Sequence, residues 1–392
     1  MVGTRPEAVK IAPVALAMAD HPTLRPVIVH SGQHDDVVEQ ALEPFDLRYD
    51  KRLIVLRTAG SQAELFSVLL PELDGLLARS APAALLVQGD TATTLASALA
   101  AFWRQIPVVH LEAGLRTHDL TAPFPEEGYR QMVTRIAALH LAPTHPAAAA
   151  LRAEGIPDDR IIITGNTVVD AVQYIDRRNL PPRCDTLRAI ENQLDRTAGR
   201  LLLVTLHRRE SWGAPLDRVL LAVRHLIQQH PDLHVLLPVH PNPLVAHQVH
   251  HHLDSTPRVH LTAPLDYPDL IRALRRASLV LTDSGGIQEE APTFGVPVLV
   301  ARDTTERAEG LHTGHATLVG TTTDRIIAAA QRRLTNARDH PLPANPYGDG
   351  NAAPRAVHAI EHLLATTDQH NTGVDHAVGH RANTPVTTGP PG

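Results

Sequence analysis

Short apolar segments alternate along the chain with longer stretches whose apolar residues recur at the spacing of a helix. The apolar segments are bounded by turn residues and lack the in-and-out alternation of a half-exposed strand. We predict strands at residues 25–30, 84–87, 108–111, 161–164, 201–206, 235–239, 259–262, 279–282 and 296–301. Helices are predicted between them, for example at residues 94–104, 128–139, 216–230 and 267–276. This order predicts an α/β protein built from doubly wound parallel sheets.

The length of 392 residues predicts two domains. Residues 176–199 break the strand–helix rhythm, because they carry Pro181-Pro182, many charges and no buried strand. We therefore expect one domain over residues 1–172 and a second over residues 173–350. The tail, residues 366–392, is rich in Thr, His, Gly and Pro with little apolar content, and we predict that it is disordered.

The start of the chain is unusual for such a fold. A Gly-Thr-Arg turn begins at Gly3 and should follow a strand, yet only Met1 and Val2 precede it. Loss of a central strand would expose the edges of its neighbours. We expect that the first strand is missing from this chain.

Composition narrows the classes of function. The net charge of −6 argues against nonspecific nucleic-acid binding, and no apolar run approaches the roughly 20 residues that span a bilayer. The first residues lack the apolar core of a signal peptide, and the single cysteine, Cys184, fits a reducing compartment. These features predict a soluble cytoplasmic protein without a nucleic-acid or membrane partner.

Candidate ligand contacts follow the predicted strands, because ligands of open α/β sheets bind beyond the carboxyl ends of the strands. The clearest group is Asp283-Ser284-Gly285-Gly286, where backbone N–H groups of the glycines and the serine hydroxyl suit a phosphate. Glu290, about one helical turn further on, suits ribose hydroxyls. The alternative is a glycine turn with an acidic helix start that stabilises the helix dipole.

Two cations, Arg5 and Lys10, lie on the predicted helix that begins near Gly3. In a chain whose only other lysine is Lys51, Lys10 beside the predicted cleft suggests an anionic ligand. A solvated helix face explains the pair equally well.

Three carboxylates, Asp90, Glu112 and Glu126, are the candidates for proton transfer, because burial in a cleft can raise the pKa of a carboxyl toward neutrality. The alternatives are N-capping for Glu126 and strand-end hydrogen bonding for the other two. His207 and His240 also follow predicted strands. We expect no metal site, because the His-rich stretch 247–252 has no acidic or cysteine partners.

Taken together, these segments resemble the bacterial non-hydrolysing UDP-N-acetylglucosamine 2-epimerases over residues 1–365. The matching motifs, in the family's order, are Gly3-Thr4-Arg5-Pro6-Glu7-Ala8-Val9-Lys10, Gly89-Asp90-Thr91, His110-Leu111-Glu112-Ala113-Gly114-Leu115-Arg116, Pro125-Glu126-Glu127, Gly165-Asn166-Thr167, His207-Arg208-Arg209-Glu210-Ser211, Pro238-Val239-His240-Pro241-Asn242-Pro243, residues 282–292, Arg302-Asp303-Thr304-Thr305-Glu306-Arg307 and Asn345-Pro346-Tyr347-Gly348-Asp349-Gly350.

The resemblance implies the GT-B fold, in which two Rossmann-like domains enclose the active site in the cleft between them. It also implies that the last helix, residues 351–365, crosses back to the first domain. The implied catalytic residues are Asp90, Glu112, Glu126 and His207. The residues implied for substrate binding are Arg5, Lys10, Arg116, Arg208, Ser284, Gly285, Gly286, Glu290 and Arg307.

The family's reaction removes the proton from carbon 2, releases UDP to give 2-acetamidoglucal, and re-adds UDP with a proton on the opposite face. It implies no cofactor, and family members are usually dimers, so we expect a homodimer with a UDP-sugar substrate. Some members bind a second UDP-N-acetylglucosamine as an activator. The residues implied for that second site are Gln33, His34, Arg209 and His240. Val68 stands where those members have an arginine.

Three other functions remain open from the sequence. A hydrolysing 2-epimerase would release UDP and free N-acetylmannosamine, but Pro6-Glu7 after the Gly-Thr-Arg turn favours the non-hydrolysing type. A GT-B glycosyltransferase would share the phosphate turn without needing three carboxylates at the sugar. A non-catalytic UDP-sugar sensor would not need Asp90, Glu112, Glu126 and His207 together.

Overall fold

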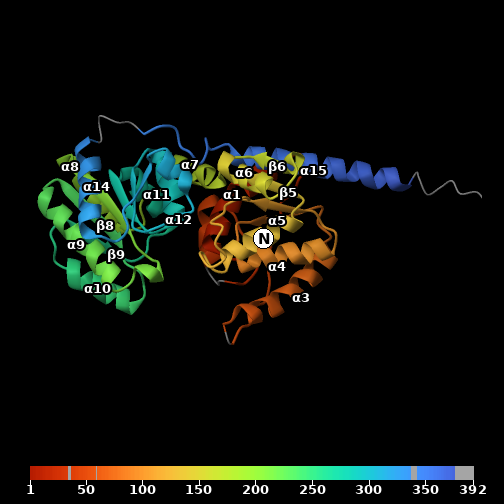
Figure 1. The fold of residues 1–392 in the computed structure, drawn as a ribbon, viewed down its shortest axis with the longest axis horizontal. Coiled ribbons are helices and arrows are strands. Elements are labelled where there is room, and N and C mark those ends of the chain that lie inside the picture. The colour runs from red at the N-terminus through yellow and green to blue at the C-terminus, as the bar shows by residue number, and fades with distance from the viewer. Residues whose placement is uncertain (34–36, 59, 337–341, 376–392) are drawn as a thin grey trace, which may run out of the picture.

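The computed structural model describes residues 1–33, 37–58, 60–336 and 342–375 as two α/β halves that lie side by side (Figure 1). The helices of the first half are α1 (Arg5–Ala19), α2 (Val37–Leu42), α3 (Gln62–Ser80), α4 (Ala92–Trp103), α5 (Glu126–Ile136), α6 (His145–Ala153) and α7 (Thr167–Arg178), with 3₁₀ turns η1 (Glu43–Phe45) and η2 (Asp158–Arg160). Its strands are β1 (Val29–His30), β2 (Lys51–Arg52), β3 (Leu85–Gln88), β4 (Val108–Leu111), β5 (Leu139–Ala142) and β6 (Ile161–Ile163).

The second half contains six strands in one parallel sheet. The strands are β7 (Arg200–Thr205), β8 (Leu233–Pro238), β9 (Val259–Thr262), β10 (Leu279–Thr282), β11 (Val298–Val300) and β12 (Ala316–Leu318). The helices are α8 (Asp185–Thr197), α9 (Ala214–Gln229), α10 (Pro243–Leu253), α11 (Tyr267–Arg276), α12 (Gly285–Glu290), α13 (Ala308–His312) and α14 (Thr323–Asn336), with 3₁₀ turns η3 (Arg209–Ser211) and η4 (Ala291–Phe294). A last helix, α15 (Ala352–Asp375), follows them in the chain.

The strand order of the second sheet is β9-β8-β7-β10-β11-β12, which is the Rossmann order. Its direction of winding reverses between β7 and β10, where neighbouring crossovers lie on opposite faces and leave a crevice at the carboxyl ends. The loops after β7 and β10 therefore meet at the natural ligand position of this half.

The first half has the same winding, but its sheet is interrupted. Strands β3, β4, β5 and β6 pair in parallel, and β1 pairs separately with β2. Between the two groups lies Val2, whose N–H donates to Val29 at 3.0 Å and whose carbonyl accepts from Ser31 at 2.8 Å. The Met1 amine donates to the carbonyl of Leu86 on β3 at 3.0 Å. Two residues thus occupy the position at which the sequence led us to expect a first strand.

Most predicted strands are observed, and three observed strands, β2, β5 and β12, were not predicted. Strand β5 was not predicted because the helical pattern assigned to residues 128–139 overlaps it, whereas α5 ends at Ile136. Strands β2 and β12 are short and carry polar or small residues, so neither forms an apolar run. Of the predicted strand at residues 25–30, only Val29–His30 pairs as a strand.

The last helix, α15, returns to the first half and lies along α1 and α7 (Figure 1). Its N-terminus is held by Asp170 of α7, whose carboxylate accepts from the N–H groups of Ala352 at 3.2 Å and Ala353 at 2.9 Å. The helix continues beyond the predicted end at residue 365 to Asp375, and residues 376–392 of the predicted tail lie outside the described residues.

One apolar core spans both halves. It contains buried residues of α1, α7, α11 and α15 together with both sheets, so α7 forms a packed bridge and not a loose linker. The arrangement is the GT-B fold. Among the helices that the structure describes, none has the length and apolar character needed to cross a membrane.

Candidate active site

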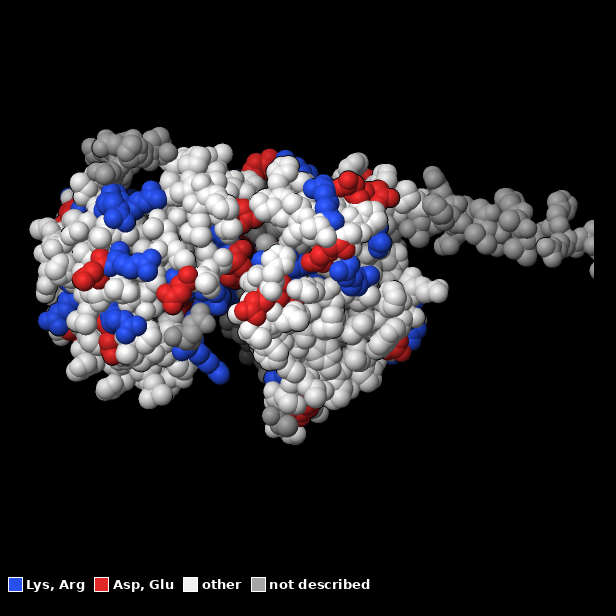
Figure 2. Space-filling view, in the orientation of Figure 1, with Lys and Arg blue, Asp and Glu red and all other residues white. Residues whose placement is uncertain are grey.

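A cleft of about 1930 Å³ separates the two halves and is lined by the carboxyl-end loops of both sheets. Figure 2 shows it as the hollow between the lobes, with acidic and basic side chains exposed on its walls. The volume exceeds the roughly 300–1,000 Å³ of a typical small-molecule pocket. The cleft can therefore hold a ligand as large as a nucleotide sugar.

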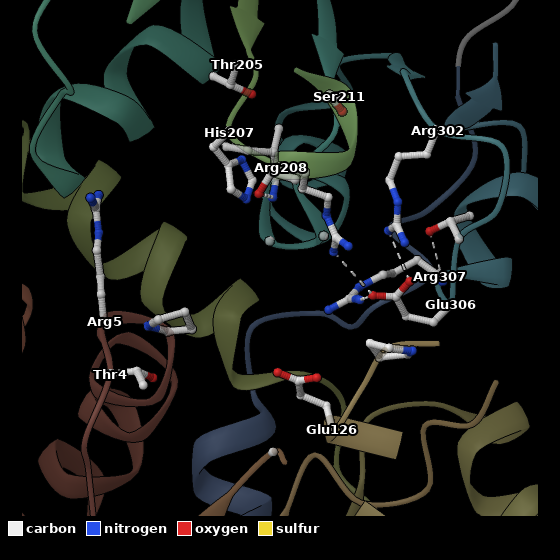
Figure 3. Close-up of a pocket in the computed structure, with 18 of the residues that line it drawn as sticks. Thr4, Arg5, Glu126, Thr205, His207, Arg208, Ser211, Arg302, Glu306 and Arg307 are labelled. Carbon is white, nitrogen blue, oxygen red and sulfur yellow. Dashed lines mark hydrogen bonds and ion pairs between the residues drawn. The ribbon is translucent and has the colours of Figure 1, made fainter. Parts of the chain in front are cut away.

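His207 and Asp283 meet at the crevice between β7 and β10. The His207 Nδ1 lies 3.0 Å from Asp283 Oδ1, and the backbone N–H groups of His207 and Arg208 donate to the same carboxylate at 3.0 to 3.1 Å. Asp283 is fully buried, whereas the His207 side chain is 51% exposed on the cleft wall (Figure 3). Burial raises the pKa of Asp283, but the hydrogen bonds and charge of His207 outweigh burial, so the net pKa is lowered.

The glycine turn that follows Asp283 packs against Arg307. A Cβ atom on Gly285 would lie 2.7 Å from the Arg307 guanidinium carbon, so only glycine allows the two to approach. At Gly286 the nearest atom to such a Cβ is Ser284 Oγ at 3.8 Å, and the turn is open toward the cleft. Ser284 is the N-cap of α12. The turn can present backbone N–H groups to an anion.

A buried charge network, which we name the interdomain charge network, joins the halves at the base of the cleft. It consists of Glu112, Lys10, Glu289 and Arg307. Lys10 of α1 contacts Glu112 after β4 and lies 2.8 Å from Glu289 of α12. Glu289 also accepts from Arg307 Nε at 3.0 Å. Lys10 and Glu289 are 6% and 1% exposed.

The two carboxyls of this network differ in their number of cationic partners. Burial raises the pKa of Glu112, and Lys10 offsets the rise only in part. Burial also acts on Glu289, but Lys10 and Arg307 together lower its pKa overall. Gln88 donates to Glu112, and Asn166 does so at 3.4 Å. Glu112 is thus the carboxyl of the network whose pKa is raised, whereas the pKa of Glu289 is lowered.

Glu306 gathers arginines on the second-half wall of the cleft. It contacts Arg307, accepts from Arg302 at 3.1 Å, and lies 3.9 Å from Arg208 (Figure 3). Burial raises the pKa of Glu306, but the positive charge of these guanidinium groups outweighs burial, and the net pKa is lowered to about 2. Glu306 therefore stays ionised and fixes the arginine positions.

Asp90 and Glu126 face the cleft from the first half, in different settings. Asp90 is ion-paired with Arg130 of α5, and Arg130 in turn lies 3.2 Å from the buried Glu127. Glu127 also accepts from the N–H groups of Thr117 and His118, so it fixes the loop before α5. The neighbouring Glu126 points into the cleft and makes no hydrogen bond or ion pair with any part of the chain that the structure describes (Figure 3).

Arg5 and Glu290 line the cleft from opposite halves. The Arg5 guanidinium lies 5.9 Å from the ring centre of Tyr267. Burial raises the pKa of Glu290 to about 7, and the nearby Arg5 limits the rise. A carboxyl with this pKa can accept a hydrogen bond from a ligand hydroxyl when ionised and donate one to it when protonated.

Two residues implied for substrate binding have other partners. Arg116 is almost fully buried and donates to Glu154 at 2.5 Å, to Thr134 at 2.8 Å and to its neighbouring carbonyl, so its donors hold the first half together. Lys10 is enclosed by two carboxylates as described above. Both carboxylates belong to the interdomain charge network, so the ammonium group of Lys10 is paired within that network.

The residues implied for a second ligand site are not joined into one group. Gln33 accepts from Thr93, at 2.7 Å from its hydroxyl and 3.3 Å from its N–H, and His240 lines the cleft with its ring 5.6 Å from that of Trp212. Arg209 is exposed on the turn after β7. His34 lies outside the described residues.

The structure adds functional candidates that sequence reasoning did not assign. These are Gln88, Glu289, Arg302 and Glu306. Gln88 ends β3, and the other three lie in segments that follow a strand, so strand-end position indicated these segments but not the contacts that their side chains make. Asp283 belongs to the predicted phosphate group, but its contact with His207 was not predicted. Among the described parts of the chain, no group of three or more His, Cys, Asp or Glu side chains is placed to hold a metal ion.

Comparisons with known proteins identify one family. A family model described as UDP-N-acetylglucosamine 2-epimerase matches residues 16–361. The UDP-N-acetylglucosamine 2-epimerase of Yersinia pestis is 41% identical over 373 residues, covering 93% of this chain and 98% of that protein. The enzyme of Bacillus subtilis is 40% identical, covering 91% and 93%. The crystal structure of the Neisseria meningitidis enzyme bound to UDP-GlcNAc has a TM-score of 0.82 at 36% identity, covering 93% of this chain and 98% of that chain.

Proposed function

The chain belongs to the UDP-N-acetylglucosamine 2-epimerase family, and we propose that it reversibly inverts carbon 2 of the sugar in UDP-N-acetylglucosamine, giving UDP-N-acetylmannosamine. The observation that carries the proposal is the composition of the cleft. Three carboxylates, Asp90, Glu112 and Glu126, line it from the first half, and an anion-binding turn with arginines faces them from the second.

UDP lies mainly against the second half in this proposal. The Ser284–Gly286 turn receives the diphosphate, Glu290 accepts from the ribose hydroxyls, and Arg5 supplies positive charge from the first half. Arg208 belongs to the same anion site, because it lines the cleft next to His207 at the end of β7. Preorganised cations of this kind stabilise the charge that develops on a departing diphosphate.

The reaction proceeds by elimination and re-addition. A carboxylate takes the proton from carbon 2, the bond from carbon 1 to the UDP oxygen breaks, and the electron pair of the former C–H bond forms the double bond of 2-acetamidoglucal. UDP then adds back to carbon 1 as a proton is delivered to the opposite face of carbon 2. Such proton transfers contribute roughly 10²–10⁴-fold to a rate.

Glu112 fits the proton-transfer role through its raised pKa. Glu126 fits it because its carboxylate points into the cleft without a partner in the described chain. The ion pair with Arg130 keeps Asp90 oriented at the carboxyl end of β3. Carboxylates distributed over the sugar site can serve the two faces that an inversion requires.

Proton NMR in deuterated water tests the proposal. Purified protein incubated with UDP-N-acetylglucosamine should give a mixture of the two UDP-sugars carrying deuterium at carbon 2. Release of free UDP with free N-acetylmannosamine would instead identify the hydrolysing reaction. Retention of the carbon-2 proton in all species would contradict the proposed function.

We also propose a cytoplasmic homodimer, in which the first halves meet. The support is a group of exposed apolar side chains on neighbouring helices: Phe102 (52% exposed) and Trp103 (59%) end α4, and Met132 (48%) lies on α5. Exposed apolar patches of this kind mark association surfaces. Light scattering after gel filtration should give a dimeric mass that Trp103→Glu reduces to the monomer, whereas Leu221→Glu on α9 leaves it unchanged. A monomeric wild type would contradict this assembly.

A further inference from the structure

We propose that Asp283 is a positioning residue, which holds the His207 ring with Nδ1 protonated and leaves Nε2 as the nitrogen that acts on the substrate. The inference rests on the proposed function for its chemistry and on the described geometry for its placement. Asp283 itself touches no substrate in this proposal, because its carboxylate is fully buried behind the cleft wall.

The two residues are placed by the sheet and not by a flexible loop. Thr205 at the end of β7 pairs in register with Thr282 at the end of β10, and their hydroxyls lie 2.6 Å apart. The N–H of Asp283 donates to the carbonyl of Thr205 at 3.3 Å. The backbone on both sides of the His207–Asp283 contact is thus tied at the point where the winding of the sheet reverses.

The carboxylate determines which ring nitrogen carries the proton. The pKa of Asp283 is lowered by His207 in spite of burial, so the carboxylate is ionised and can only accept hydrogen bonds. Its oxygens accept from two backbone N–H groups and lie 3.0 Å from His207 Nδ1. Nδ1 must therefore donate. Nε2 makes no hydrogen bond within the described chain, and the ring lines the cleft.

A ring fixed in this way can assist departure of UDP. When the imidazole is protonated, Nε2–H donates to a diphosphate oxygen as the bond to carbon 1 breaks, and the proton can pass to that oxygen. The same proton returns to Nε2 when UDP adds back, so the step balances over one turnover. Ionised Asp283 stabilises the ring whenever it is cationic, before the proton leaves Nε2 and after it returns, in the way that a buried carboxylate supports a catalytic histidine elsewhere.

The first measurement uses the unaltered protein. Long-range proton–nitrogen NMR spectra of protein labelled with ¹⁵N-histidine report the tautomer of each ring, and the signals absent from His207→Gln identify His207. We expect Nδ1 to carry the proton of the neutral ring. A neutral ring protonated at Nε2 would overturn the proposal, whether or not the protein is an epimerase.

The second measurement is kinetic and uses Asp283→Asn. The amide keeps an oxygen for the backbone N–H groups, but its NH₂ faces Nδ1 and forces the other tautomer. We expect kcat to fall by roughly 100-fold or more, in the range of a lost general acid, while KM for UDP-N-acetylglucosamine changes by less than about threefold. A rise in KM with kcat retained would show that Asp283 only shapes the UDP turn, and would refute the positioning role.

A double variant separates action through His207 from an independent role. If Asp283 acts only through the ring, the double variant Asp283→Asn/His207→Gln is as active as the less active of the two single variants. Multiplying losses would overturn the proposal. Asp217→Asn is the matched control, because Asp217 contacts His252 Nε2 at 2.7 Å in another aspartate–histidine pair outside the cleft, and it should retain wild-type kcat and KM.

Discussion

Replacing Glu289 with glutamine should lower the free energy of unfolding by about 3 kcal/mol, because it removes the central charge of the interdomain charge network. Glu289 lies between two cations, 2.8 Å from Lys10 and 3.0 Å from Arg307, and is 1% exposed. The substitution preserves the volume of the side chain. The change therefore tests the charge and not the packing.

The magnitude follows from the partners that remain. At an effective dielectric constant of about 20, a charge pair 3 Å apart is worth roughly 5 kcal/mol before the cost of desolvation is subtracted. Breaking a buried pair costs about 3–5 kcal/mol once that cost is included. We take the lower end, because Lys10 keeps Glu112, Arg307 keeps Glu306, and the amide oxygen can still accept from Arg307 Nε.

Urea denaturation of Glu289→Gln beside the wild type checks this value. Asp74→Asn, which breaks an exposed pair with Arg104, serves as the control and should leave the midpoint unchanged. The reasoning fails if Glu289→Gln unfolds at the wild-type midpoint, since the variant loses a buried carboxylate that attracts two cations in the native state. It also fails if the control loses as much stability as Glu289→Gln does.

Three further predictions follow from particular contacts. Burial lowers the pKa of His110 from 6.5 to about 4, so between these pH values the unfolded chain is protonated at this residue and the native state is not. The free energy of unfolding should therefore fall by about 3 kcal/mol as the pH is lowered from 6.5 to below about 4, and His110→Gln should flatten the pH dependence of the urea midpoint. Gly285→Ala should lower the melting temperature and weaken UDP binding in calorimetry by displacing Arg307, whereas Gly128→Ala, in a helix with free space around it, should raise the melting temperature. Asp170→Ala should cost about 1–2 kcal/mol in the same denaturation experiment by uncapping α15, and an unchanged midpoint would contradict the cap.

The sequence was sufficient to predict the fold class and the edge of each sheet at which the cleft lies. Apolar strands such as β4 and β10 are buried on both faces, so their pattern is unambiguous. Strand β5 was lost because Leu139 continues the helical pattern of α5, and β12 because three residues with one threonine carry no periodic signal. Boundaries of this kind are set by tertiary pairing, which local pattern does not contain.

Prediction of the site stopped at the identity of the partners. Strand-end position identified Glu112 and His207, but not the side chains that bind them. Glu289 and Asp283 are distant from Lys10 and His207 in the chain, and only the packing of α12 against α7 and the pairing of β10 with β7 bring them together. For the same reason the ion pair of Arg116 with Glu154, 38 residues further along the chain, could not be predicted from its position after β4.

The return of α15 to α1 also has a consequence for synthesis. Ala353, Ala356 and Ile360 of α15 are buried in the same core as α1, so a surface that α1 forms is covered by residues that are translated after the second half. On the ribosome, the entire second half emerges before that cover arrives, since domains generally fold in the order of synthesis. The first half must wait with an apolar face exposed, and a nascent chain released before residue 352 would present that face to chaperones or to other nascent chains.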